Sequence, residues 1–400
     1  MQKEVSRRII PYSRQTISKE DVEAVVAALH DELLTQGPSV TDFELAIAAY
    51  VQNEHGALAV NSASTGLEVA YKALGVGPGS IVWLPPISYV ATANAALTLG
   101  AKVGFVDVCP KTGLMDMSKF RLELERASVG EMALPNVVTV VHYAGNSADM
   151  KSLKQLSLEF GFKIVEDAAH AIGGLYQCGE LIGCCRYSDA AVFSFHPVKV
   201  ITAGEGGAVV FKQNECMERA VRLINNGVNK NRSKFSKFVG NKGEYWYEQD
   251  QVGLNYRMSG INAALARSQL SRIDSNIFKR RAIAKRYRDN LSVDSVANYA
   301  DLKNGANHLF PILLNTGCIE SKANALEFLA NKGIAAGVHY IPICDQPLYN
   351  LQNLLSHKPS IDCARAFFLS AVSIPMFESL SGDEIGYVID CVNELGSIYV

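Results

Sequence analysis

Residues 81–108 read IVWLPPISYVATANAALTLGAKVGFVDV, and this stretch decides the fold. Two short apolar runs, Ile81-Leu84 and Val103-Val106, enclose a segment with helical spacing of its apolar residues, Val90-Leu99. A strand, a helix and a second strand in this order form a unit whose two strands run parallel. The stretch therefore predicts a parallel sheet with helices packed on it.

The same alternation continues on both sides, from about residue 56 to residue 211. We expect further strands at 57–60, 137–141, 163–165, 190–193 and 208–211, and further helices at 65–74, 118–126 and 150–160. The sequence thus predicts an α/β fold in which a mostly parallel sheet lies between two layers of helices.

The pattern changes at residues 228–250, where lysines and arginines are interleaved with aromatic residues without clear periodicity. We interpret this segment as a loop that closes over a charged small substrate. Helices are expected at 260–273 and 277–291, followed by a strand at 308–313. We therefore predict an N-terminal arm and large α/β domain over residues 1–250, and a smaller α+β domain over residues 251–400.

Composition narrows the class of partner. The 38 basic and 40 acidic side chains nearly cancel, which argues against nucleic acid or a membrane surface as the partner. No apolar run reaches the ~18 residues of a membrane helix. The nine cysteines form no Cys-x-x-Cys pair and are odd in number, so we expect no metal site and reduced thiols in a cytoplasmic protein. A small molecule is the expected partner.

Ligands of open parallel sheets bind at the carboxyl ends of the strands. Two polar segments there can be interpreted either as ligand-binding sites or as helix caps. Asn61 to Leu67 starts a helix with small hydroxyl residues, which suits a phosphate group but equally suits simple capping. Glu166, Asp167 and His170 follow a strand. A carboxylate there could hold a cationic ring nitrogen protonated, as a pyridoxal phosphate (PLP) ring requires, or it could be a capping aspartate.

A third segment, Ser194 to Lys199, follows another strand and precedes the glycine-rich run Gly204-Glu205-Gly206-Gly207. A lone lysine is usually a solvated surface residue. This one lies between two strands of the buried type, where its amine could become a Schiff-base nucleophile if burial lowers its pKa.

Seven segments in this order resemble the DegT/DnrJ family of sugar aminotransferases, a branch of the fold-type I PLP enzymes, over nearly the whole chain. They are Leu34 to Pro38, Asn61 to Leu67, Val90 to Ala95, Glu166 to Ala171, Phe193 to Lys199, Gly204 to Gly207 and Gly253 to Met258. The resemblance implies a PLP-dependent aminotransferase that acts on a nucleotide-linked sugar.

The resemblance also implies residue roles. Lys199 would carry PLP as a Schiff base and shuttle protons, and Asp167 would pair with the pyridinium nitrogen. The other implied cofactor contacts are Ser64, Thr65 and Ser194 to the phosphate, Asn255 to the phosphate from the second subunit of a homodimer, Tyr89 stacked on the ring and His170 near its 3-hydroxyl. The implied substrate contacts are Tyr12, Gln36, His196, Glu205, His339 and Tyr340.

Within the family, the chain is most similar to the PseC type of pseudaminic acid biosynthesis, which serves surface polysaccharide formation and flagellin glycosylation. Those enzymes use L-glutamate to aminate C4 of UDP-2-acetamido-2,6-dideoxy-β-L-arabino-hex-4-ulose. Cys344 and Asn226 replace histidines that many relatives carry, so another UDP- or dTDP-linked 4-keto sugar is an alternative. A sugar dehydratase would have histidine in place of Lys199, and a non-catalytic regulator would not need the pair of Lys199 and Asp167.

Overall fold

A seven-stranded sheet forms the centre of the computed structural model, which describes residues 9–235, 245–292, 301–314, 318–351, 353–357 and 360–398. The strand order is β1-β7-β6-β5-β4-β2-β3. The strands are β1 (Ala57–Val60), β2 (Ile81–Leu84), β3 (Lys102–Phe105), β4 (Val137–Val141), β5 (Lys163–Asp167), β6 (Ala190–Ser194) and β7 (Gly207–Phe211). Only β7 runs against its neighbours β1 and β6, so the prediction of a mostly parallel sheet is confirmed.

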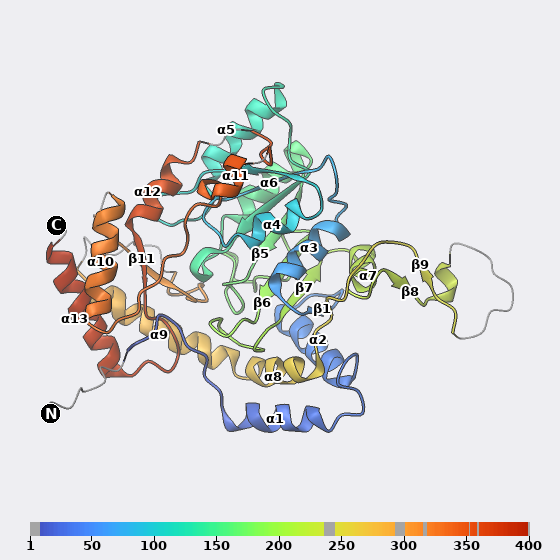
Figure 1. The fold of residues 1–400 in the computed structure, drawn as a ribbon, viewed down its shortest axis with the longest axis horizontal. Helices are drawn as coiled ribbons and strands as arrows, with labels where there is room; N and C mark the ends of the chain where they lie inside the picture. The colour runs from blue at the N-terminus through green and yellow to red at the C-terminus, as the bar shows by residue number, and fades with distance from the viewer. Residues whose placement is uncertain are drawn as a thin grey trace.

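Helices cover both faces of the sheet, as predicted (Figure 1). One layer contains α2 (Pro38–Val51), α5 (Met117–Ser128), α6 (Met150–Phe160) and α8 (Gly260–Leu270). The opposite layer contains α3 (Ala63–Ala73), α4 (Ala91–Leu97) and α7 (Asn214–Leu223). Each predicted helix begins and ends within four residues of an observed one. The helix expected over 260–273 ends at Leu270, and the helix expected over 277–291 begins at Ile273.

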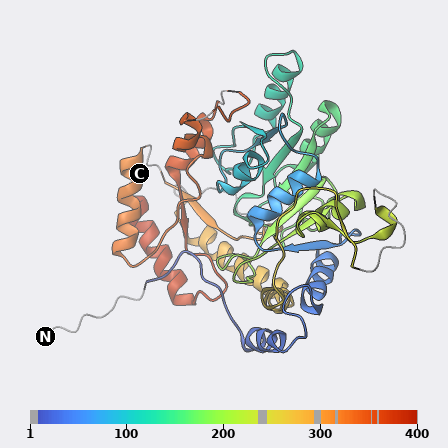
Figure 2. The ribbon, with the colours of Figure 1, turned by 45° about the vertical axis from the view of Figure 1, so that its right-hand side comes forward.

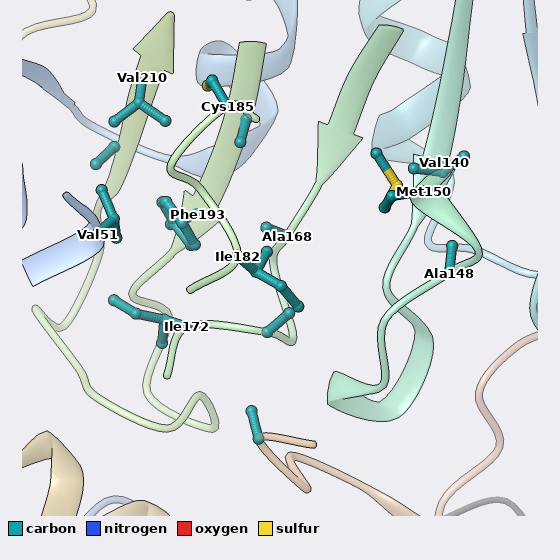
Figure 3. Close-up of a cluster of buried hydrophobic side chains, with 14 of the residues drawn as sticks. Val51, Val140, Ala148, Met150, Ala168, Ile172, Ile182, Cys185, Phe193 and Val210 are labelled. Atoms are coloured by element: carbon teal, nitrogen blue, oxygen red, sulfur yellow. The ribbon is translucent and has the colours of Figure 1, made fainter. Parts of the chain in front are cut away.

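The side chains of each strand alternate between two apolar cores, because successive strand residues point to opposite faces. In β6, Ala191 and Phe193 belong to the core under α2 and α6, whereas Ala190 and Val192 belong to the core under α3 and α7. Figure 3 shows part of the first core, where Phe193 lies near Val51 and Ile182. This alternation decides which side chains of each strand end can reach the same ligand.

A third apolar core lies in the C-terminal part of the chain, left of the sheet in Figure 1. Its elements are α9 (Ile273–Asn290), β10 (Phe310–Leu313), α10 (Ile319–Asn331), β11 (Ala371–Ile374) and α13 (Gly382–Ile398). The helices α11 (Pro347–Leu351) and α12 (Asp362–Ser370) also come from this part of the chain, but their buried side chains pack into the core under α3, α4 and α7. The boundary at residue 250 stays a prediction. The helix α8 after it packs on α1 (Lys19–Leu29) and α2, and the third core begins only within α9.

The N-terminal segment connects this third core to the sheet. Ile10 is buried in the third core and pairs with Ile334 through hydrogen bonds of its N–H to Gly333 O and of Ala335 N–H to its carbonyl, both 2.9 Å. The chain then passes Tyr12, whose carbonyl accepts the Met376 N–H at 2.9 Å, before α1 begins.

The segment expected as a loop at 228–250 contains a short antiparallel ribbon of β8 (Val228–Asn229) and β9 (Glu248–Gln249). Both views show this ribbon projecting away from the body of the molecule beside α7 (Figure 2). Residues 236–244 of the predicted loop lie outside the described residues.

Short 3-10 turns occur at Tyr143–Gly145, Arg232–Lys234 and Ile343–Asp345.

None of the described helices is long and apolar enough to cross a membrane.

Candidate active site

A cavity of about 330 Å³ lies at the carboxyl ends of β4, β5 and β6. Its volume falls within the range of roughly 300–1,000 Å³ typical of small-molecule sites. The predicted site residues that line it are Tyr12, Ser64, Tyr89, Asp167, His170, Ser194, His196, Lys199, Glu205, His339 and Tyr340. Segments that are far apart in the sequence therefore meet at one place.

Asp167 ends β5 and is buried on the face of the sheet that carries α3 and α4. Thr92 donates a hydrogen bond to its Oδ2 at 2.7 Å, and the Ala169 N–H donates to its Oδ1 at 3.1 Å. Burial raises the pKa of Asp167, while these two hydrogen bonds and the nearby Lys199 act in the opposite direction. The carboxylate is thus held in one orientation at the cavity wall.

Lys199 follows β6 through a turn that is closed by the hydrogen bond of the Lys199 N–H to His196 O at 2.9 Å. Its side chain keeps some accessible surface and lines the cavity, but the amine lies deep in the protein. Burial lowers the pKa of Lys199 to about 8, although Asp167 pulls it upward. A lysine amine that is partly neutral near neutral pH is a competent nucleophile and proton carrier.

The N-terminus of α3 points its first backbone N–H groups at the same cavity, which Ser62, Ala63 and Ser64 line. Ser62 caps the helix by accepting the Thr65 N–H at 3.3 Å. The exposed Ser64 hydroxyl and the Ser194 hydroxyl add donors beside the free N–H groups and the positive end of the helix dipole. Capping by Ser62 is therefore confirmed, and phosphate binding at the helix end beside it stays a prediction.

Four histidines line the cavity, and sequence reasoning missed one of them, His308. The rings of His308 and His170 lie 4.6 Å apart between centroids, and His170 Nε2 is 3.1 Å from the Tyr340 hydroxyl. Burial lowers the pKa of His170 and His308, and lowers that of His339 to about 4. The rings of His170, His308 and His339 are therefore neutral at pH 7.

Some predicted residues lie elsewhere. The Thr65 hydroxyl donates to Asn61 Oδ1 at 2.6 Å and lines a neighbouring depression with Glu68 and Asn94. Gln36 and Asn255 are exposed and do not line the cavity of their own chain. The departures Asn226 and Cys344 do not line it either.

A second buried carboxylate, Glu166, lies on the opposite face of β5 from Asp167. Glu166 accepts hydrogen bonds from His142 Nε2 at 2.6 Å, from the Tyr176 hydroxyl at 2.8 Å and from the Ser188 hydroxyl. His142 Nδ1 accepts the Ala148 N–H, so the ring proton lies on Nε2 and points at Glu166. The main-chain N–H of His142 also donates to Asp167 O at 3.1 Å, which ties this network to the end of β5.

The residues present fit PLP. The cavity offers a deep amine of lowered pKa, a fixed carboxylate for a ring nitrogen, and a helix N-terminus with hydroxyls for a phosphate. The Nδ1 atoms of His170 and His308 are buried and have no hydrogen-bond partner, which leaves polar atoms for a bound group to satisfy. Among the described residues no cluster of histidine, cysteine and carboxylate side chains could hold a metal ion.

A family model described as the DegT/DnrJ/EryC1/StrS aminotransferase family matches residues 15–393. A chain from Campylobacter jejuni named UDP-4-amino-4,6-dideoxy-N-acetyl-β-L-altrosamine transaminase is 35% identical over 387 residues, which are 96% of each chain.

Solved structures agree with this match. Helicobacter pylori PseC, described as an aminotransferase of pseudoaminic acid biosynthesis, is 28% identical and superposes with a TM-score of 0.87 over 98% of this chain and 100% of its own. Spr1654 from Streptococcus pneumoniae, described as a sugar aminotransferase and solved in PMP and PLP forms, is 26% identical in the PMP form, with a TM-score of 0.86 over 98% of this chain and 100% of its own.

Proposed function

Since this chain belongs to the DegT/DnrJ/EryC1/StrS aminotransferase family and is therefore a PLP-dependent sugar aminotransferase, we propose that it transfers the amino group of L-glutamate to C4 of a nucleotide-linked 4-keto-6-deoxy sugar. The observation that carries the proposal is the meeting of a buried lysine of lowered pKa, Lys199, and a fixed carboxylate, Asp167, in one cavity. The proposed sugar is UDP-2-acetamido-2,6-dideoxy-β-L-arabino-hex-4-ulose.

The choice of sugar rests on the relatives. The Campylobacter jejuni chain is named for a UDP-linked 4-amino sugar, and the Helicobacter pylori structure for pseudoaminic acid biosynthesis. The cavity wall suits a polar, uncharged ring, because Tyr12, His339 and Tyr340 present aromatic surface with hydroxyl and imidazole groups. Other UDP- or dTDP-linked 4-keto sugars remain the alternative, since Cys344 and Asn226 depart from the family pattern.

Each residue has a defined task in the proposed reaction. Lys199 Nζ would hold PLP and, once released, would take a proton from the donor carbon and return it to the cofactor side. Asp167 would keep a proton on the ring nitrogen, and Ser64, Ser194 and the α3 N-terminus would hold the phosphate. Bound PLP supplies an electron sink that stabilises negative charge at the carbon losing its proton.

We also propose a homodimer with shared sites. Asn255, proposed for the cofactor phosphate, is exposed and outside the cavity of its own chain, and no described residue of the projecting β8–β9 ribbon lines that cavity. The helix α1 exposes an apolar stripe of Val22, Val26 and Leu29, each about half accessible, on a helix whose other side packs on α8. A second copy that covers this stripe could bring its Asn255 and ribbon to the site.

Lys199→Ala tests the proposal. The purified parent protein should be yellow, and borohydride should fix the cofactor to it covalently, whereas the variant should show neither the fixed cofactor nor transamination. A variant that still fixes the cofactor covalently and still catalyses transamination would contradict the assignment of Lys199.

A panel of nucleotide-linked 4-keto sugars tests the substrate. The parent protein is first converted to its amino form with glutamate, and the sugar that restores the yellow absorption is the acceptor. Restoration by dTDP sugars alone would overturn the UDP proposal, and loss of a sugar hydroxyl without transfer of nitrogen would indicate a dehydratase.

A further inference from the structure

Thr92 lies in the first turn of α4 with only 1% of its surface accessible, and its hydroxyl has three oxygen neighbours. These are Asp167 Oδ2 at 2.7 Å, Ser88 Oγ at 2.7 Å and Tyr89 O at 3.2 Å. A hydroxyl carries a single proton, so it can donate to only one of them at a time.

The chemistry of the three neighbours decides the direction. An ionised carboxylate accepts but cannot donate, and a hydrogen bond to a charged group is stronger than one to a neutral carbonyl. The Thr92 proton therefore points at Asp167, and the Thr92 oxygen accepts the proton of Ser88, which is also buried. The result is a directed relay from Ser88 through Thr92 to Asp167.

This relay and the Ala169 N–H hold one oxygen each of the Asp167 carboxylate, so the carboxylate cannot rotate. We propose that Thr92, oriented by Ser88, is a positioning residue that keeps Asp167 ionised and turned toward the ring nitrogen of PLP. The inference rests on the proposed role of Asp167 and adds two residues that the sequence reading left unassigned.

Other titratable groups also face Asp167, and they do not replace the relay. Lys199 faces it from the segment after β6, His142 from the segment after β4, Tyr71 from α3 and Tyr340 from the C-terminal part. None of them makes a side-chain hydrogen bond to the carboxylate among the described residues, whereas Thr92 does. Removing the Thr92 hydroxyl should therefore raise the pKa of Asp167 above its already raised value.

The sign of the effect follows from this pKa. A protonated ring nitrogen needs an ionised carboxylate, and a carboxylate with a higher pKa becomes protonated at a higher pH as the solution is acidified. The acid limb of cofactor binding and of kcat should therefore move to higher pH in Thr92→Val, which removes the hydroxyl and keeps the shape. Thr92→Ser keeps a hydroxyl at this position, so its acid limb should lie close to that of the parent.

The experiment measures the Kd of PLP for the apoprotein, and kcat and KM for glutamate with the holoenzyme, across the pH range of the acid limb. Losing one hydrogen bond to a charged group predicts about a tenfold rise in Kd and fall in kcat for Thr92→Val on the acid limb, with KM little changed. Thr92→Ser should stay within about threefold, and Ser88→Ala should shift in the same direction as Thr92→Val by less.

Ser157→Ala is the control for Ser88→Ala, because it also removes a buried, hydrogen-bonded hydroxyl. The Ser157 hydroxyl donates to Phe162 O at 2.7 Å, and Ser157 does not line the cavity. The inference is overturned if the Kd of PLP and the kcat of Thr92→Val on the acid limb stay within twofold of the parent values. It is also overturned if Thr92→Ser loses as much affinity and kcat as Thr92→Val. If Thr92→Val does not fold, Ser88→Ala against Ser157→Ala decides. A parent protein that binds no PLP overturns the proposed function instead.

Discussion

At the scale of the residue, Lys199 combines a useful property with a cost in stability. Burial lowers its pKa from the ordinary 10.5 to about 8, which means that the folded protein favours the neutral amine. The unfolded chain holds the proton more tightly, so folding releases it between those two pH values. The reactive amine therefore destabilises the cofactor-free protein at neutral pH.

Lys199→Met should accordingly stabilise the apoprotein at pH 7, by about 2 kcal/mol or more. The sign follows from linkage: the parent loses stability as the pH falls through 10.5, and the loss is complete below about pH 8. Chemical denaturation of both apoproteins at several pH values measures the difference. A difference that stays constant from neutral pH to pH 11 would contradict the lowered pKa.

Residue roles could be predicted only where local sequence decides them. Asp167, Ser194 and Lys199 could be placed near one edge of the sheet because each lies at or after the end of a strand, whereas their roles in one site were implied by the family resemblance. His308 was missed because the resemblance implied no role for it, and its place at the cavity depends on long-range packing of the C-terminal part. Thr92 was seen only as part of a motif, since a threonine in a first helical turn usually reflects capping.

At the scale of the element, β5 presents two acids with opposite surroundings. Asp167 faces the cavity, and Glu166 faces a dry network of His142, Tyr176 and Ser188. Successive side chains of a strand point to opposite faces of the sheet, so Glu166 and Asp167 contact different groups although they are neighbours in the sequence. The network behind the strand therefore fixes the strand end from which Asp167 projects.

Glu166→Ala should lower the free energy of unfolding by about 3 kcal/mol or more, because it leaves three buried donors without an acceptor. Urea denaturation of the apoprotein measures this loss. Glu159→Ala is the control, since Glu159 is an exposed partner of Arg121 and its loss should cost less than about 1 kcal/mol. Equal losses in both variants would argue against the network.

The elements themselves were largely predictable, because apolar residues recur every second position in a half-buried strand and about every 3.6 positions in a helix. The reversed direction of β7 was not predicted, since the alternation of strands and helices gives strand order along the chain but not strand orientation after a glycine-rich turn. The β8–β9 ribbon was also missed, because its strands are only two residues long.

At the scale of the whole molecule, the proposed shared site can be tested by mixing inactive subunits. Lys199→Ala and Asn255→Ala chains are unfolded together, refolded and assayed. A hybrid dimer would contain one site with both an intact lysine and an intact asparagine, so random pairing predicts about a quarter of the parent activity.

Mixing Lys199→Ala with Lys199→Met chains is the matched control, because no site then contains a lysine and no activity should return. Absence of recovery in the first mixture, with hybrids demonstrated by size or mass, would show that each chain builds its site alone.

The N-terminal segment has a consequence for how the chain is made. Ile10 is synthesised early, but its pairing partner Ile334 and its third-core neighbour Ile374 come near the end. At roughly 5–20 residues per second, the ribosome needs on the order of half a minute between them. The large sheet can form in that interval, whereas the third core cannot close until Ile334 and the elements after it have been synthesised. A ribosome stalled before Ile334 should therefore hold a chain whose first apolar segment is still open to chaperones and proteases.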